Sequence, residues 1–104
     1  PLEHPQSGKT FKIQLGAMSS RRKAEFLWNE TFRNNKVLLS DLRASFERVE
    51  KANKVIWRLR AGDFNTEENA TEVCAQLLRE NKNSSGCLVI TDYPEEPGHN
   101  VSSN

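Results

Sequence analysis

The strongest pattern in the sequence is an amphipathic stretch that begins at about Lys36 or Ser40 and ends at Ala61. Its apolar residues recur every three or four positions, which is the spacing of one face of an α-helix. They are Leu38, Leu39, Leu42, Phe46, Val49, Ile56 and Trp57. Gly62 follows, and glycine is the preferred residue just beyond a helix C-terminus. The stretch therefore predicts a long helix that organises the core.

The same stretch also fits a short coiled coil. A single Asn at an a position can fix the register and the dimeric state of such a coil. The a positions would hold Leu39, Phe46 and Asn53, and the d positions Leu42, Val49 and Ile56. The repeat is short and Phe suits an a position poorly, so a bundle helix with one polar residue in its stripe is the favoured interpretation.

Two shorter helices and two strands accompany this stretch. The serines at 19–20 can cap a helix that runs to about Asn34, and Asn65 can open a third helix with acidic residues in its first turn. Residues 10–15 alternate strictly between apolar and polar side chains, and residues 87–91 form a short β-prone run. Each of these two segments predicts a strand.

The predicted order of elements is strand, helix, helix, helix, strand. We therefore expect a mainly α fold, a small three-helix bundle with two short flanking strands, with an α+β fold as the alternative. A chain of 104 residues allows one domain. Proline, glycine and polar residues at both ends predict a flexible tail at 1–8, a single helical domain at 9–91 and a disordered tail at 92–104.

The charge is unevenly distributed along the chain. Residues 19–62 carry eleven Lys or Arg against five Asp or Glu, whereas residues 63–104 carry two against eight. Such asymmetry is typical of nucleic-acid binding, of an acidic partner, or of two halves of one fold that attract each other. No apolar run is long enough to span a bilayer, so we expect no membrane partner.

The residues that most often carry catalysis are poorly placed for it. His4 and His99 lie in the expected tails, where neither can be held beside a nucleophile. Cys74 and Cys87 fall in apolar stretches and lack the close spacing of a zinc-ligand pair, so they are interpreted as buried apolar residues or as one disulfide. We therefore expect no enzymatic activity, no metal and no cofactor.

The candidate site residues lie on two surfaces. Phe26 falls on the charged side of its helix beside Arg22 and Arg33, and these three form a candidate contact for a protein partner. The second candidate is a basic surface that could contact phosphates. It consists of Arg21, Arg22, Lys23, Lys51, Lys54 and Arg58.

These observations favour a non-enzymatic module of a larger protein that binds another protein or assembles with itself, for example as a homodimer. Two cysteines are few for a secreted domain of this size, so we expect an intracellular location, in the cytoplasm or nucleus. One alternative is a nucleic-acid-binding helical domain that uses residues 19–62. The other is a secreted, glycosylated domain with a Cys74–Cys87 disulfide, because Asn-x-Ser/Thr sequons occur at Asn29, Asn69, Asn83 and Asn100.

Overall fold

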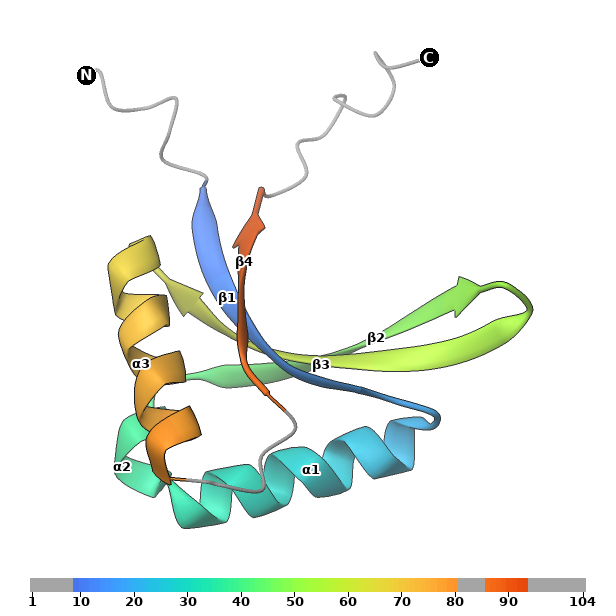
Figure 1. Ribbon diagram of the computed structural model, residues 1–104, viewed down its shortest axis with the longest axis horizontal. Coiled ribbons are helices and arrows are strands. Elements are labelled where there is room, and N and C mark those ends of the chain that lie inside the picture. Colours follow the sequence, from blue (N-terminus) through green and yellow to red (C-terminus); the bar gives the residue numbers. More distant parts are fainter. Residues whose placement is uncertain (1–8, 81–85, 94–104) are drawn as a thin grey trace.

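The computed structural model describes residues 9–80 and 86–93. Along this part of the chain the elements are β1 (Thr10–Met18), α1 (Arg21–Asn34), α2 (Lys36–Leu39), β2 (Arg43–Lys51), β3 (Lys54–Phe64), α3 (Glu67–Glu80) and β4 (Leu88–Asp92) (Figure 1). The strands form one antiparallel sheet in the order β2-β3-β1-β4. The tails expected at 1–8 and 92–104 lie outside the described residues, except that residues 92 and 93 are described and Asp92 ends β4.

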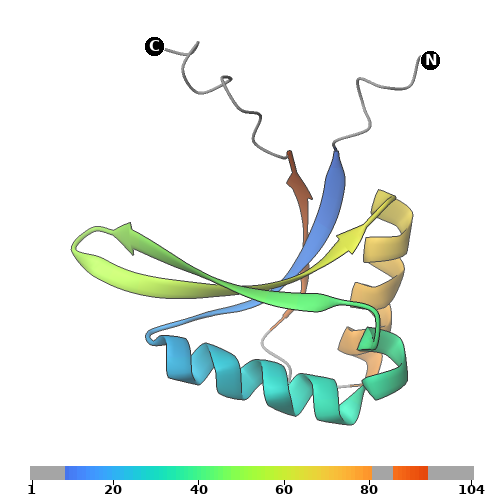
Figure 2. The same ribbon diagram turned by 180° about the vertical axis from the view of Figure 1, so that it is seen from behind.

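The helices α1 and α3 pack on the same face of the sheet (Figures 1 and 2). α1 contacts β1, β2 and β3, whereas α3 contacts β1, β3 and β4. Between the layers lies one core, formed by Ile13, Leu15, Ala24, Leu39, Leu59, Ala61, Phe64, Ala70, Cys74 and Leu77. Successive side chains of a strand point to opposite faces. The other face of the sheet is therefore left without a covering helix in the described part of the chain.

The prediction of one long helix between residues 36 and 61 is wrong. This stretch forms the short helix α2 and the β2–β3 hairpin, whose paired residues run from Arg43 and Gly62 to Lys51 and Lys54. The chain reverses at residues 52–53, which have φ values of 51° and 66°. Positive φ at both central residues is the pattern of a type I′ hairpin turn. The fold is thus α+β, which the sequence suggested only as an alternative, and both the three-helix bundle and the coiled coil are incorrect.

The error has a physical reason, because this stretch satisfies two periodicities at once. Phe46 and Val49 have helical spacing, but residues 57–61 read Trp-Arg-Leu-Arg-Ala, which is the alternation of a half-buried strand. β3 is an interior strand, so pairing with β1 and β2 provides partners for its backbone on both sides. Gly62 lies inside β3, and a Cβ there would be 2.8 Å from Cγ of Lys12 on β1.

The helices expected on either side of this stretch are confirmed. Ser20 caps α1, because its hydroxyl accepts a hydrogen bond from the backbone N–H of Lys23 at 3.1 Å. At the start of α3, Oγ1 of Thr66 accepts a hydrogen bond from the N–H of Asn69 at 3.0 Å. The capping residue is therefore Thr66 rather than the predicted Asn65, and the helix begins at Glu67. The two expected strands are also present, as β1 and β4.

A disulfide joins α3 to the sheet. Cys74 in α3 and Cys87, directly before β4, are bonded with their Cα atoms 5.5 Å apart. Cys74 is buried and belongs to the core, so the bond holds β4 against the helix layer. Disulfides persist mainly in oxidising compartments and are rare in the cytosol. The bond therefore argues against an intracellular location.

The hairpin turn provides a test of this fold. Ala52→Gly should leave the free energy of unfolding unchanged or raise it by up to about 1 kcal/mol, because glycine adopts positive φ without the steric cost that alanine carries. Within a helix the same substitution would lower it by about 1 kcal/mol, and Ala75→Gly in the middle of α3 is the matched control for that loss. Chemical denaturation measures both changes. An equal loss in the two variants would contradict the hairpin.

Candidate functional site

The face of the sheet opposite the helices, here called the open face, carries polar and charged side chains from all four strands. Its members follow from the strand register, because Ile13, Phe46 and Leu59 on the same strands contact the core. They include Lys12, Gln14, Arg43, Ser45, Glu47, Val49, Lys51, Lys54, Ile56, Arg58, Arg60, Leu88, Ile90 and Asp92. Six of these side chains are cationic and two are carboxylates, so the open face favours anionic or strongly polar ligands.

At the centre of the open face lies an arginine cluster, formed by Arg58, Arg60, Glu47 and Gln14. Oε1 of Glu47 lies 3.6 Å from Nη1 of Arg60 and 3.9 Å from Nη1 of Arg58. Nε of Arg60 donates a hydrogen bond to Oε1 of Gln14 at 2.8 Å. One carboxylate is therefore shared by two guanidinium groups, which leaves a net positive charge and further N–H donors for a ligand.

Partial burial holds these side chains in place more firmly than an ordinary surface ion pair would. The side chains of Arg58 and Arg60 are 28% and 20% exposed, whereas Glu47 is 52% exposed. Partial burial and the bond to Gln14 limit the rotamers of Arg60, so less conformational freedom is lost when a ligand binds. The cluster is thus a partly preorganised set of donors.

A second polar group lies where β1 runs between β3 and β4. The ammonium group of Lys12 forms ion pairs with Asp63 and, at 3.5 Å, with Asp92. Burial by itself lowers the pKa of Lys12, but the hydrogen bonds and negative charges of Asp63 and Asp92 outweigh it and raise the pKa above its usual value. Lys12 is therefore cationic and already neutralised, and it contributes structure to the open face rather than free charge.

Apolar side chains border the arginine cluster. Val49 on β2 is paired directly with Ile56 on β3, and both are half-buried. On the other side, Leu88 on β4 is 60% exposed. A polar centre with apolar margins suits a ligand whose units combine polar edges with apolar faces.

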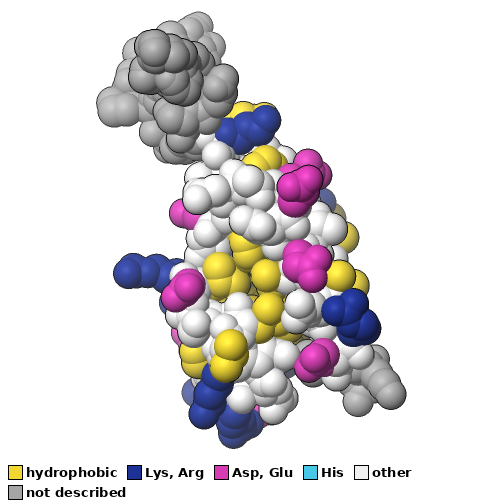
Figure 3. Space-filling view, turned by 90° about the vertical axis from the view of Figure 1, so that its left-hand side faces the viewer, with side chains coloured by type: hydrophobic (Ala, Val, Ile, Leu, Met, Phe, Trp, Pro, Cys, Tyr) yellow, Lys and Arg dark blue, Asp and Glu magenta, His cyan; other side chains and the backbone are white. Residues whose placement is uncertain are grey.

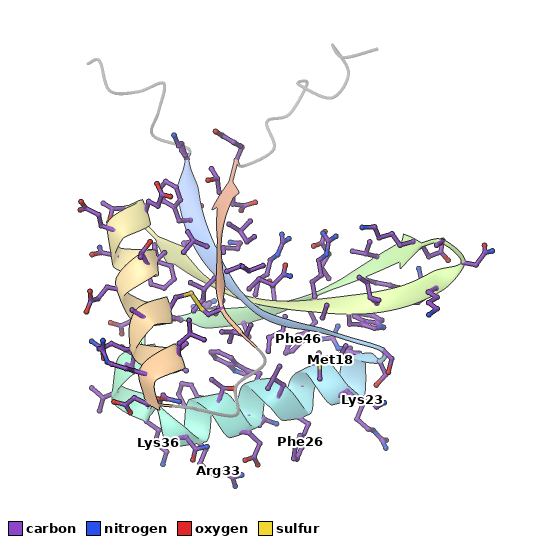
Figure 4. The ribbon with its side chains drawn as sticks, viewed as in Figure 1. Met18, Lys23, Phe26, Arg33, Lys36 and Phe46 are labelled. Atoms are coloured by element: carbon purple, nitrogen blue, oxygen red, sulfur yellow. A yellow bond between two sulfur atoms is a disulfide. The ribbon has the colours of Figure 1, made fainter. Side chains whose placement is uncertain are left out.

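The residues expected to contact a protein partner lie on the opposite side of the molecule. Phe26 points away from the sheet on the outer side of α1, and Arg33, Lys23 and Lys36 point the same way (Figure 4). Phe26 is 65% exposed. Arg22 is also exposed on this helix, and Arg33 forms an ion pair with Glu30. The structure therefore keeps the predicted group together as a surface of α1.

The expected basic surface is divided between two faces. Lys51, Lys54 and Arg58 belong to the open face, whereas residues 21–23 lie at the start of α1. The guanidinium carbon of Arg21 lies 4.9 Å from the ring centroid of Phe46, so this side chain covers the edge of the core. The six cations therefore do not form one surface.

The outer side of α3 is acidic. Figure 3 shows this side of the molecule, where magenta acidic side chains flank a central group of yellow apolar ones. A shallow hollow there is lined by Glu67, Glu68, Thr71, Glu72 and Ala75. The described residues contain no group of His, Cys, Asp and Glu side chains that could hold a metal ion. These carboxylates lie in the first turns of α3, where the helix dipole favours them.

Sequence reasoning missed three members of the arginine cluster: Gln14, Glu47 and Arg60. Glu47 lies in the stretch that was expected to be one long helix, and within one helix it could not be paired with Arg58 across two strands. The available signal was the alternation in residues 57–61, which places both arginines on one side of a strand. Gln14 lies at a polar position of the predicted first strand. Only the strand register, which pairs Gln14 with Arg60, shows that it belongs to the same cluster.

The fold and the open face define a small α+β binding domain, in which one sheet face is covered by helices and the other is available to a ligand. The chain belongs to the SPOR domain family, whose model matches residues 7–91. SPOR domains are non-catalytic binding domains, so the expectation of a non-enzymatic binding module is confirmed.

Two solved structures share the fold. The SPOR domain of RlpA from Pseudomonas aeruginosa has a TM-score of 0.59 and 14% identity, covering 81% of this chain and 99% of that one. The peptidoglycan binding domain of the cell wall lytic enzyme CwlC from B. subtilis has a TM-score of 0.52 and 19% identity, covering 81% and 90%. No curated protein sequence matches the chain.

Family membership corrects two expectations. SPOR domains act in the periplasm or at the cell wall, so the intracellular location expected in the cytoplasm or nucleus is wrong, in agreement with the Cys74–Cys87 disulfide. Their partner is not a nucleic acid, which removes the nucleic-acid alternative. In the described part of the chain, no helix has the length and apolar character needed to cross a membrane.

Proposed function

We propose that the domain binds peptidoglycan through the open face of its sheet. Membership in the SPOR family and the likeness to the peptidoglycan binding domain of CwlC support this ligand. The observation that carries the proposal is the arginine cluster, because Arg58, Arg60 and Gln14 present several donors on the side of the sheet that no described helix covers. The core-facing side of the same strands is filled and has no room for a ligand.

The chemistry of the open face fits the proposed polymer. Peptidoglycan consists of amino-sugar rings with hydroxyl, amide and carboxylate groups on their edges. Guanidinium groups recognise carboxylates with paired hydrogen bonds, and the amide of Gln14 can both donate and accept. The less polar face of a sugar ring can lie on the Val49–Ile56 pair or against Leu88. Each part of the polymer thus meets a matching part of the open face.

Glu47 gives the free domain a defined arrangement of these donors. Its carboxylate holds both guanidinium groups without neutralising them completely, since one negative charge serves two positive ones. A ligand carboxylate can take over part of this contact while Glu47, which is the most exposed member of the pair network, moves toward solvent. The two arginines then stay oriented throughout binding.

Binding to purified peptidoglycan tests the proposal. Arg60→Ala should weaken binding by roughly tenfold or more, because a hydrogen bond to a charged group contributes about 1.5–3 kcal/mol. Arg58→Ala should weaken it in the same direction. Arg22→Ala removes the same charge from the helix side and is the matched control, which should change affinity by less than about twofold. Co-sedimentation with isolated cell walls over a concentration series measures all three.

A loss that is equal for Arg60→Ala and Arg22→Ala would contradict the assignment of the open face, because binding would then follow net charge alone. Circular dichroism of each variant checks that the fold is kept. Arg60 is partly buried, so Arg60→Lys provides a variant that keeps the charge and most of the packing while removing the planar fork. It should bind more weakly than the parent chain.

A second candidate function, protein binding by the outer side of α1, is favoured by the 65% exposure of Phe26 beside Arg22 and Arg33. Exposed aromatics ringed by polar groups are frequent anchors of interfaces. A photoreactive phenylalanine analogue in place of Phe26 should then form a protein adduct in cells, and Arg22→Glu should abolish it. The same analogue at Ala75 on α3 is the control. Equal adducts at both positions, or none at Phe26, would exclude this second function.

A further inference from the structure

The β2–β3 hairpin extends past the body of the domain. Its tip projects beyond the N-terminal end of α1 in both ribbon views (Figures 1 and 2). Phe46 and Trp57 are the last hairpin residues toward the tip that pack against the core. The segment beyond them and beyond Glu47, residues 48–56, is here called the hairpin arm. No described helix covers either face of its outer part.

The arm continues the open face without interruption. Moving outward from Arg58 and its partner Glu47, the next pair on the same face is Val49 with Ile56, and the last is Lys51 with Lys54. A polar cluster, an apolar pair and a cationic pair therefore follow one another in a line. Arg60 and Lys54 are six residues apart on one strand, which corresponds to about 20 Å.

The lysine pair at the tip has no evident structural role. Lys51 and Lys54 are directly opposite each other and both are exposed, and like charges in this arrangement destabilise a hairpin. Neither forms an ion pair with a carboxylate in the described part of the chain, although Arg48 and Glu50 on the other face of β2 are paired at 3.5 Å. The two-residue turn at 52–53 fixes the backbone positions from which the two lysine side chains extend.

We propose that the hairpin arm is an additional subsite that engages the same polymer chain beyond the arginine cluster. The Lys51–Lys54 pair binds an anionic group, a carboxylate, on a later unit of that chain, and the Val49–Ile56 pair supports the sugar ring between the two. This inference rests on the proposed function, because it assumes that peptidoglycan binds the open face. The same polymer chain is expected to occupy the hairpin arm because the arm continues the open face and ends in an uncompensated positive charge.

The arm makes affinity depend on the length of the ligand. A fragment that covers only the arginine cluster gains nothing from the lysine pair, whereas a fragment longer than about 20 Å reaches both. Exposed ion pairs each contribute little, so the two lysines together should strengthen the binding of long fragments by roughly fivefold. The effect should weaken as the salt concentration rises, because the contacts are exposed.

The experiment measures binding of a disaccharide–peptide fragment and of a long glycan fragment, both prepared from peptidoglycan, by isothermal titration calorimetry. The double variant Lys51→Gln/Lys54→Gln should lose roughly fivefold in affinity for the long fragment and less than twofold for the short one. Lys23→Gln/Lys36→Gln removes two exposed charges from the helix side and should affect neither. A loss that is equal for both lengths, or no loss for the long fragment, would overturn the inference.

A third variant separates binding from stability. Lys51→Glu creates an opposite-charge pair with Lys54, so it should raise the melting temperature while weakening the binding of the long fragment. If Lys51→Glu binds the long fragment as tightly as the parent chain does, the inference is overturned. If the parent chain binds neither fragment, the proposed function itself fails and the inference falls with it. If it binds both fragments equally, only the arm is excluded.

Discussion

The packing of α1 and α3 against a single face of the sheet determines the rest of this structure. Ile13 on β1 and Leu59 on β3 are fully buried in that contact, and the alternation of side chains then directs Gln14, Arg58 and Arg60 to the opposite face. The core thus needs only half of the side chains in each strand. The other half is available for recognition, and the disulfide from α3 to β4 holds the sheet edge while this face stays uncovered.

The same arrangement explains how a small domain accommodates two partly buried arginines. Burying an unpaired guanidinium group would be costly, but Arg60 has Gln14 and Glu47 as partners, and Arg58 shares the Glu47 carboxylate. The cluster is therefore stable without a ligand and still has donors to offer. The hairpin extends this face outward in the same register, so the proposed binding surface is elongated rather than compact.

The sequence predicted the elements that local signals determine. The serine cap of α1 and the alternating residues of β1 are contiguous in sequence, so both elements were predicted, although β1 continues to Met18, beyond the predicted end at residue 15. The hairpin was missed because Phe46 and Val49 have helical spacing while strand pairing joins residues up to 19 positions apart, from Arg43 to Gly62. Of the site, Arg58 was identified as a surface cation, but its partner Glu47, and the partner Gln14 of Arg60, could be recognised only once the register was known.

A ligand that binds the open face of the sheet should perturb the strands and leave the helix side unaffected. Nuclear magnetic resonance can show this when isotope-labelled domain is titrated with soluble peptidoglycan fragments and the backbone amide resonances are followed. We expect the shifts to concentrate on β1, β2 and β3 around Gln14, Glu47, Arg58 and Arg60, while the amides on the outer side of α1 stay unchanged. Shifts confined to α1 around Phe26, with an unperturbed sheet, would contradict it.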